Sequence, residues 1–250
     1  MKDKVSVIIP FYKNLKYLFC SIKSVLNQTY KNYEILLIYD DDEKKDLKII
    51  KKKFKRLKKL IIVENKKNLG VAKSRNIGLS KSKGKYIAFL DSDDYWKKDK
   101  LKKQINFMKK NSLDFSYSSY EILSRNFKKK YTVKKTYTYD ELLKKCDIGL
   151  STVIMKSKLS KLGTFPLLRT QEDFALWLKF LRTGVKLMGI NSSLVYWRDV
   201  PGSLSKNVIQ KLKDSFKVYY KYEKKNFLES IFRVLILSKN KLIKIYKTKY

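Results

Sequence analysis

Apolar positions along the first half of the chain follow two different periods. Runs of consecutive apolar residues predict strands that are buried on both faces of a sheet. Between these runs lie segments in which apolar residues recur every three or four positions, which predicts helices with one buried face. The predicted strands are residues 5–9, 34–39, 60–63 and 85–90, and the predicted helices are residues 15–26, 44–59 and 72–79.

This alternation of strands and helices has a consequence for the fold. Strand–helix–strand units with right-handed crossovers form a parallel sheet that carries helices on its faces. The sequence therefore predicts an α/β fold with a Rossmann-like, mostly parallel central sheet flanked by helices. In such sheets the ligand lies at the carboxyl ends of the strands.

The order of elements is less regular after residue 96. Residues 124–138 are polar and rich in Lys, Tyr and Thr, which predicts a loop or an edge strand, and residues 206–250 form a basic tail with two helical patterns. No stretch approaches the roughly 18–20 uncharged apolar residues of a membrane span. We also expect helices at 98–110 and 172–181 and strands at 114–118, 153–155, 187–190 and 194–197.

The chain is strongly basic, with 59 Lys and Arg against 23 Asp and Glu and a formal net charge of +36. Only seven of these basic residues are Arg, whereas proteins that bind nucleic acids usually rely on Arg for bidentate contacts to phosphate and guanine. Lys, Ile, Asn and Tyr are abundant and Gly is scarce, which is the bias of an AT-rich genome. We therefore interpret the charge as a compositional bias that favours solubility and attraction to anionic lipid, and we expect no nucleic-acid partner.

Two absences restrict the chemistry. The sequence has no His, which excludes Ser-His-Asp triads, Cys-His nucleophiles and His-ligated zinc. Its two cysteines, Cys20 and Cys146, are too few for an all-thiolate zinc site, and their scarcity fits a reduced, cytosolic setting. Acid–base catalysis in this chain must use carboxylates, Lys or Tyr.

Acidic residues follow two of the predicted strands, at the edge where α/β sheets bind ligands. Asp40, Asp41 and Asp42 end one strand, and Asp91 and Asp93 follow another. Clustered like charges repel one another, so we expect a cation or hydrogen-bond donors beside them. The Asp91-x-Asp93 pair offers two hard oxygen ligands, which suit Mg²⁺ or Mn²⁺ and, through the metal, a diphosphate. The alternative interpretation is an ordinary solvated turn.

A further acid, Asp173, follows Glu172 at the start of the helix predicted at 172–181. Acids in the first turn of a helix commonly complement the helix dipole, and this alternative applies to both residues. The residue pattern alone leaves a catalytic role and a structural role open.

Several motifs occur in a fixed order over roughly residues 4–205. In this order and spacing the chain resembles the family 2 glycosyltransferases, which have the GT-A fold. The first motif reads V-S-V-I-I-P-F-Y, a later one reads D-S-D-D, and a third reads Q-E-D-F-A-L-W-L. All of them together lie at residues 5–12, 24–30, 33–38, 68–76, 84–94, 171–178, 197–198 and 203–205.

The resemblance implies four residues that hold the nucleotide-sugar. Pro10 and Tyr12 at the exit of the first strand and Asp40 after the second match the nucleotide-binding positions of the family. Tyr12 is then expected to stack on a uracil-type base and Asp40 to accept the imide N–H of that base. Arg75 matches an arginine in the segment that faces the donor. The alternatives are that Tyr12 packs in the core and that Arg75 makes a surface ion pair.

The resemblance also implies a metal site, a catalytic base and a reaction. Asp91 and Asp93 match the D-x-D motif that holds a divalent ion, Mg²⁺ or Mn²⁺, against the donor diphosphate, and both thereby contribute to donor binding. Asp173 matches the carboxylate that acts as the catalytic base. The implied reaction moves a sugar from a nucleotide-diphosphate donor, most often a UDP-sugar in this family, to an acceptor hydroxyl with inversion at the anomeric carbon. The implied acceptor is a glycan or a lipid-linked saccharide.

The same resemblance divides the chain into three parts. Residues 1–95 match the nucleotide-sugar-binding half of a single GT-A domain, residues 96–205 the acceptor-binding and catalytic half, and residues 206–250 the basic helical tail. Apolar residues 234–237, flanked by Lys, are compatible with a tail that lies on an anionic membrane surface. The alternative is a helix that packs on the catalytic domain. We expect a cytoplasmic enzyme that attaches peripherally to the cytoplasmic face of the inner membrane through this tail.

The sequence departs from the family pattern in three places. The turn at residues 39–42 lacks the usual glycine, Val200 stands where many relatives have a histidine that helps to hold metal or diphosphate, and residues 96–170 carry no recognisable motif. Two other functions compete with the transferase. One is a nucleotidyltransferase, which is disfavoured because no Gly-rich loop precedes the first helix. The other is a basic nucleic-acid-binding protein without enzymatic activity.

Overall fold

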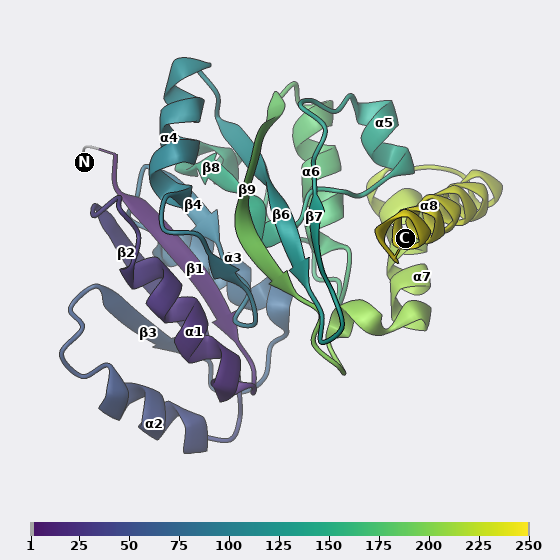
Figure 1. Ribbon diagram of the computed structural model, residues 1–250. Coiled ribbons are helices and arrows are strands. Elements are labelled where there is room, and N and C mark those ends of the chain that lie inside the picture. Colours follow the sequence, from purple (N-terminus) through teal and green to yellow (C-terminus); the bar gives the residue numbers. More distant parts are fainter. Residues whose placement is uncertain (1–2, 250) are drawn as a thin grey trace.

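A computed structural model describes residues 3–249, with the backbone alone described at residues 205 and 244–249. Within this range nine strands form one mixed sheet, and helices lie on its faces (Figure 1). The strands are β1 (Val5–Phe11), β2 (Tyr33–Tyr39), β3 (Leu60–Glu64), β4 (Tyr86–Phe89), β5 (Tyr95–Trp96), β6 (Phe115–Leu123), β7 (Lys128–Tyr131), β8 (Ile154–Lys156) and β9 (Leu187–Arg198).

Eight α-helices accompany the strands in the described residues. They are α1 (Leu15–Leu26), α2 (Lys45–Lys53), α3 (Val71–Lys81), α4 (Lys100–Lys110), α5 (Tyr139–Lys144), α6 (Glu172–Arg182), α7 (Val208–Lys217) and α8 (Phe227–Lys249). Each predicted helix and strand has a counterpart among these elements. The α/β fold predicted from the sequence is therefore confirmed.

The sheet brings the carboxyl ends of six strands to one edge. Its order is β3-β2-β1-β4-β8-β6-β9-β5, with β7 paired to the outer part of β6. Strands β1 to β4 pair in parallel, and β8 is antiparallel to both β4 and β6. Strands β6 and β9, which are parallel to each other, therefore run in the same direction as β1. Parallel pairings are the longest in this sheet, as the residue pattern predicts.

Strand β1 continues two residues beyond its predicted end and passes through Pro10. The backbone of Ile8 faces β4, where its carbonyl accepts from Leu90 N, and the carbonyl of Phe11 faces β2, where it accepts from Asp40 N. Because backbone direction alternates along a strand, Pro10 faces the β4 side, beyond the last residue of β4. The missing N–H of proline therefore costs no ladder hydrogen bond at this position.

Two other boundaries differ from the sequence pattern. Helix α2 ends at Lys53 instead of residue 59, because the chain turns through residues 54–59 to pair Leu60 with Ile35. The short strands predicted at 187–190 and 194–197 are one strand, β9, whose register against β6 shifts near Ser193. The polar residues 191–193 that break the apolar pattern thus form an irregularity in a continuous strand. The segment 124–138 contains the edge strand β7.

Helix α6 packs against the sheet through large aromatic side chains. Trp177 is fully buried, and its ring lies 4.8 Å from that of Phe115 on β6 and 6.2 Å from that of Phe165. Phe165 in turn contacts Phe89 at the end of β4, with 5.3 Å between ring centroids. These contacts fix the start of α6 beside the carboxyl end of β4.

The tail packs on the rest of the molecule through the inner faces of α7 and α8, which lie beside α5 and α6 in Figure 1. The Tyr219 hydroxyl donates to the Leu143 carbonyl over 2.6 Å, and Asn240 Nδ2 donates to the Lys144 carbonyl over 2.8 Å. Leu237 is buried between the helices. Among residues 3–249 there is no helix with the length and apolar content needed to cross a membrane.

Candidate active site

Asp94, the last residue of the acidic turn after β4, holds this turn in place. Asp94 is almost fully buried, and it accepts from Ser151 Oγ over 2.6 Å and from Arg198 N over 3.0 Å. Burial, together with the charges of Asp93 and Asp91, raises the pKa of Asp94 well above its ordinary value. Asp94 therefore acts as a buried anchor for the turn that carries Asp91 and Asp93.

Arg198 at the end of β9 holds the same turn from the other side. Its Nη1 donates to the Asp93 carbonyl over 2.6 Å, and its guanidinium lies 4.4 Å from the centre of the Tyr95 ring and 5.2 Å from that of Tyr17. Nη2 lies 2.8 Å from Cys20 Sγ. The last strand of the sheet is thereby tied to the acidic turn and to α1.

Arg75 joins three segments that are distant in the sequence. From α3 its Nη2 donates to Asp91 Oδ1 over 2.6 Å, and its Nη1 donates to Glu172 Oε1 at the start of α6. The guanidinium is buried and lies 5.7 Å from the centre of the Phe165 ring. The surface ion pair considered as an alternative for Arg75 is therefore wrong, because the pair lies in the interior. Its Nε has no hydrogen-bond partner among the described residues.

Asp173 lies next to this ion-pair cluster. Its side chain is only partly covered, unlike that of Glu172, and Oδ1 accepts from Phe174 N over 2.7 Å. The charges of Arg75 and Asp91 both act on Asp173. The structure thus brings Asp173 to the same place as the acidic turn, although about 80 residues separate them in the sequence.

The carboxylates in this cluster hold their protons more tightly than usual. Burial, followed by the charge of Asp91, raises the pKa of Asp93 to about 6, and burial raises the pKa of Glu172 to about 7 despite its pairing with Arg75. Burial also raises the pKa of Asp173. Burial alone would lower the pKa of Arg75. The surrounding carboxylates outweigh burial and keep this pKa above the ordinary value. Such perturbed groups concentrate at functional sites.

The nucleotide-binding residues implied by the resemblance lie at the same sheet edge but differ in exposure. Tyr12, just beyond β1, exposes half of its surface, so it does not pack in the core, as the alternative required. Asp40 is buried and accepts hydrogen bonds from Asn65 Nδ2, Leu69 N and Gly70 N, at 2.7, 2.8 and 2.9 Å. Asp40 therefore organises the turn that starts α3, which carries Arg75.

The carboxylates of Asp91 and Asp93 suit a divalent cation that also takes ligands from a phosphate group. No group of three or more Asp, Glu, His or Cys able to hold a metal occurs in the described range 3–249. The charge of Asp91 nevertheless helps to raise the pKa of Asp93, and a divalent ion relieves such repulsion. Mg²⁺ commonly binds through one or two carboxylates together with substrate phosphates. Two carboxylates therefore fit the expected metal, with the remaining ligands coming from a diphosphate and water.

Sequence reasoning assigned no site role to Glu172, Asp94 or Arg198. The sequence allowed Glu172 to be an acid that complements the helix dipole. Only its contact with Arg75 in the structure indicates a role in the site. The sequence alone does not distinguish Asp94 from any other acid in a solvated turn. Arg198 carried a signal, because it ends one of the ordered motifs. Val200, which replaces the usual histidine, is buried and offers no metal ligand.

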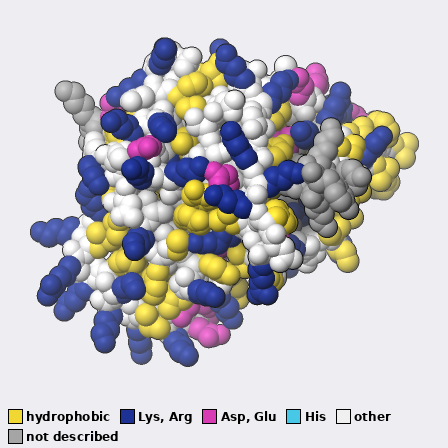
Figure 2. Space-filling view, viewed as in Figure 1, with side chains coloured by type: hydrophobic (Ala, Val, Ile, Leu, Met, Phe, Trp, Pro, Cys, Tyr) yellow, Lys and Arg dark blue, Asp and Glu magenta, His cyan; other side chains and the backbone are white. Residues whose placement is uncertain are grey.

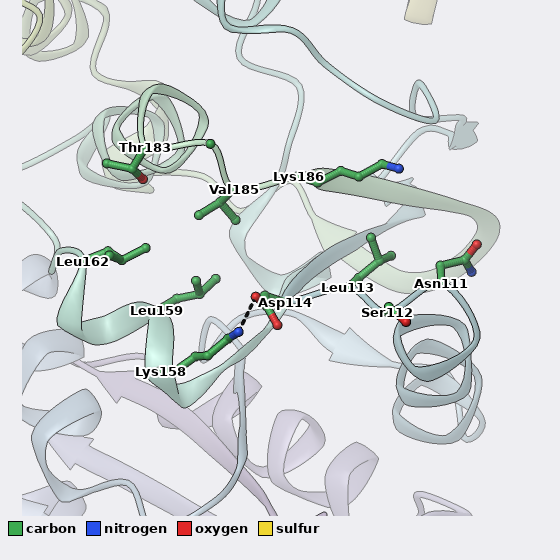
Figure 3. A pocket seen from close by; sticks show the side chains of 11 residues that line it. Asn111, Ser112, Leu113, Asp114, Lys158, Leu159, Leu162, Thr183, Val185 and Lys186 are labelled. Atoms are coloured by element: carbon green, nitrogen blue, oxygen red, sulfur yellow. Dashed lines mark ion pairs between the residues drawn. The ribbon is translucent and has the colours of Figure 1, made fainter.

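A separate cavity of about 510 Å³ lies at the opposite edge of the sheet (Figure 3). It is lined by residues that precede β6 and β9, including Leu113, Asp114 and Val185, and Lys158 pairs with Asp114 over 2.6 Å across it. These residues lie at the amino ends of the strands, so this cavity is not part of the acidic site.

Comparison with known proteins identifies the family. The family model described as glycosyl transferase family 2 matches residues 6–161, more than half of the chain. The chain belongs to glycosyltransferase family 2. The resemblance inferred from the ordered motifs is thereby confirmed, and family membership favours a glycosyltransferase over the nucleotidyltransferase and nucleic-acid-binding alternatives.

This family 2 enzyme is similar along most of its length to two curated relatives and to one solved structure. TuaG of Bacillus subtilis, named as a glycosyltransferase of teichuronic acid biosynthesis, is 33% identical over 242 residues, which are 96% of each chain. WfaP of Escherichia coli, named as a UDP-Glc:α-D-GlcNAc-diphosphoundecaprenol β-1,3-glucosyltransferase, is 38% identical over 84% of this chain and 83% of its own. The crystal structure of S. aureus TarS residues 1–349 with UDP-GlcNAc superposes with a TM-score of 0.73 at 20% identity, covering 91% of this chain and 69% of TarS, and confirms the GT-A fold.

Proposed function

We propose that this enzyme transfers a sugar from a UDP-sugar to a hydroxyl of a lipid-linked glycan, with inversion at the anomeric carbon. The observation that carries the proposal is the cluster of Asp91, Arg75, Glu172 and Asp173, which three separate elements bring to the carboxyl edge of the sheet. The names of the relatives support the donor and the acceptor class, since WfaP is named for UDP-Glc and a diphosphoundecaprenol acceptor.

The donor nucleotide is proposed to bind at the ends of β1 and β2. The exposed ring of Tyr12 is available to stack on the base, and Pro10 fixes the backbone that presents it. Asp40 already accepts three hydrogen bonds, and a carboxylate has about four acceptor positions, so one remains for the imide N–H of uracil. Arg75 is proposed to lie on the sugar side of this site.

The donor diphosphate is proposed to be held through Mg²⁺ or Mn²⁺ on Asp91 and Asp93. A divalent ion supplies Lewis-acid stabilisation of the negative charge that develops on a departing diphosphate. Asp94 and Arg198 keep the turn in place, and Arg75 orients the Asp91 carboxylate by its 2.6 Å contact. Arg198 and Arg75 act on Asp93 through their charges, but among the described residues neither of them forms a direct ion pair with its carboxylate.

Asp173 is proposed as the general base. Its raised pKa makes it a better proton acceptor than an exposed carboxylate, and its partly open surface admits a hydroxyl. The acceptor oxygen forms a bond to the anomeric carbon while the bond from that carbon to the diphosphate oxygen breaks. The hydroxyl proton passes to Asp173, so no covalent sugar–enzyme intermediate is needed. Glu172, engaged by Arg75, positions the start of α6.

The acceptor is proposed to reach the site from a membrane. In this assignment residues 1–95 bind the donor, residues 96–205 bind the acceptor and carry the base, and residues 206–250 attach the enzyme to anionic lipid. Support comes from the outer face of α8, where Leu228, Phe232 and Leu235 expose more than half of their surface. We place the enzyme peripherally at the cytoplasmic face of the inner membrane.

Donor hydrolysis without acceptor tests the metal site. UDP-sugar hydrolysis that needs Mn²⁺ or Mg²⁺ is expected for the natural protein and is expected to disappear in Asp93→Ala. Asp140→Ala, which removes an exposed acid elsewhere, is expected to leave it unchanged. Activity that does not depend on the cation, or that survives in Asp93→Ala, contradicts the assignment of the metal ligands.

The base is tested by a second variant. Asp173→Asn is expected to bind the UDP-sugar as the natural protein does, since the amide keeps the size of the carboxylate. Transfer is expected to fall by roughly 10²–10⁴-fold, the usual contribution of a general base. Transfer kinetics and calorimetric donor binding, measured side by side, check this. Normal turnover by Asp173→Asn shows that another group takes the proton.

A further inference from the structure

The hydroxyl of Ser151 joins the first and the last residue of the acidic turn. Ser151 lies in the 3₁₀ helix Leu150–Thr152, in the half of the chain where the sequence carries no recognisable motif. Its Oγ accepts from Asp91 N over 3.1 Å and donates to Asp94 Oδ2 over 2.6 Å. The residue is almost fully buried. A side chain from outside the acidic turn therefore contacts both ends of it.

Two buried side chains hold the backbone that carries this hydroxyl. Trp96 Nε1 donates to the Ser151 carbonyl over 2.9 Å, and Gln104 Nε2 on α4 donates to the Thr152 carbonyl, also over 2.9 Å. Both Trp96 and Gln104 are buried. The Ser151 hydroxyl is thus presented to the acidic turn by a segment that cannot shift without breaking these hydrogen bonds.

The two contacts of Ser151 require a hydroxyl group. The Asp91 N–H can only donate and the Asp94 carboxylate accepts, so the group between them must accept from the one and donate to the other. A hydroxyl does both with a single oxygen atom, whereas the thiol of Cys does so only weakly and the methyl of Ala does neither. Among side chains of similar size, only those of Ser and Thr meet this requirement.

Asp91 is consequently held at two points. Its backbone N–H donates to Ser151, and its carboxylate accepts from Arg75 Nη2 over 2.6 Å. Asp93, two residues later, is held through its backbone carbonyl by Arg198. Because both residues of the Asp91-x-Asp93 pair are restrained before a cation binds, little order has to be gained on binding. Loss of one restraint is therefore expected to weaken the binding of the cation.

We infer that Ser151 is a positioning residue for the divalent cation, since its hydroxyl holds the Asp91 backbone where both carboxylates face one ion. The inference rests on the proposed function and assigns a role in it to a residue of the second half of the chain. Groups that orient the ligands of a metal commonly contribute about 10–100-fold to its affinity. The effect is expected in cation binding and not in the rate at saturating cation, because the buried hydroxyl contacts only the acidic turn.

Electron paramagnetic resonance of Mn²⁺ in the presence of excess UDP tests this role, because free and bound Mn²⁺ give different signals. Ser151→Ala is expected to weaken Mn²⁺ binding by about tenfold or more. Ser151→Thr keeps the hydroxyl and is expected to stay within about threefold of the natural protein. Ser160→Ala is the matched control. Its hydroxyl donates to the Ser157 carbonyl over 2.7 Å, and its loss is expected to change Mn²⁺ binding by less than about twofold.

The dependence of UDP-sugar hydrolysis on Mn²⁺ gives a second measurement. In Ser151→Ala the Mn²⁺ concentration for half-maximal rate is expected to rise by about tenfold or more, while the rate at saturating Mn²⁺ stays within about twofold. A merely structural serine would lower stability without changing the Mn²⁺ affinity of the folded protein. Equal affinity of Ser151→Ala and the natural protein, or equal losses in the Ala and Thr variants, therefore overturns the inference.

Ser151→Cys keeps the size of the side chain and provides the same test if the Ala variant does not fold. It is expected to weaken Mn²⁺ binding as well, because a thiol is a weak donor and a weak acceptor. Undiminished Mn²⁺ binding by this variant overturns the role of the hydroxyl. Absence of Mn²⁺ binding by the natural protein with UDP overturns the proposed metal site instead, so the two failures are distinguishable.

Discussion

Arg75 shows how one residue organises the site. Its buried guanidinium pairs with Asp91 and Glu172, and the two contacts join the acidic turn after β4 to the start of α6. Arg presents several donors in a rigid plane, whereas Lys is a single point charge. The geometry of this position therefore depends on Arg, and the neutralisation it provides allows three carboxylates to share a small volume.

Lys100 is a contrasting residue, since its ammonium group has no hydrogen-bond partner in the described residues. Its side chain is fully buried, its Nζ has no hydrogen-bond partner, and its nearest ring is that of Trp96, 4.2 Å away. Burial lowers the pKa of Lys100 well below its ordinary value. Because burial disfavours the charged form that the unfolded chain carries at neutral pH, this lysine reduces stability there.

Substitution of Lys100 by Met, which has a similar volume, is therefore expected to stabilise the protein at pH 7, by about 1–3 kcal/mol. The gain is expected to shrink as the pH approaches 10, because the unfolded lysine also loses its proton there. Urea unfolding of both proteins at pH 7 and pH 9.5 measures the two values. A destabilised Lys100→Met at pH 7 contradicts the interpretation. Lys102→Met, on the exposed face of α4, serves as the control.

At the scale of elements, the docking of α7 on the segment before α6 determines where the tail lies. Asp214 is buried at this contact. Burial alone would raise the pKa of Asp214. The hydrogen bonds that its carboxylate accepts from Gln210, Thr170 and Lys217 outweigh burial and hold this pKa below the ordinary value. The contact thereby couples the tail to the catalytic half of the molecule.

Asp214→Ala is expected to release α7 from this segment. Loss of the carboxylate leaves the buried Thr170 N–H without a partner, which costs about 1–3 kcal/mol of stability. Transfer to a lipid-linked acceptor is expected to fall severalfold, while UDP-sugar binding stays unchanged. Denaturant unfolding and transfer kinetics check both parts. Asp214→Asn, which keeps one acceptor oxygen, is expected to lose less stability and less transfer activity than Asp214→Ala. Equal impairment of the two variants argues against the hydrogen-bond role of Asp214.

At the scale of the whole molecule, positive charge and exposed apolar side chains coincide on the tail. Residues 206–250 contain thirteen Lys and Arg against three acids. Each of these acids is paired within the protein, Asp214 with Lys217, Glu223 with Arg182 and Glu229 with Arg233. Figure 2 shows apolar side chains at the right-hand edge, over α8, on a face otherwise rich in Lys and Arg. This combination suits an anionic lipid surface.

Co-sedimentation with vesicles tests that surface. The protein is expected to bind phosphatidylglycerol vesicles and to be released by salt, and to bind phosphatidylcholine vesicles at least tenfold more weakly. Replacement of the exposed Leu228, Phe232 and Leu235 by Ser is expected to weaken binding at least tenfold, because these side chains lie on one face of α8. Ile61→Ser, an exposed apolar position on β3, is the control. Equal binding by the triple variant and the natural protein contradicts a role for α8.

Local patterns carried most of the fold and part of the site. Buried parallel strands are apolar throughout and helices are apolar on one face, so both are visible in short windows of sequence. The position of Asp91 and Asp93 after β4 followed from the same patterns, because the end of a strand is a local feature. The ordered motifs added Tyr12, Arg75 and Asp173 through resemblance, and the roles of these residues remain predictions.

Long-range contacts could not be derived in this way. Arg75 and Glu172 are 97 positions apart, and Thr170 and Asp214 are 44 positions apart. The order of strands in the sheet and the burial of each helix face decide such contacts, and neither is encoded in a short window of residues. Periodicity and chemistry along the chain therefore predicted the elements and the acids at their ends, whereas packing of distant segments determined which charges meet and which remain without a counter-ion.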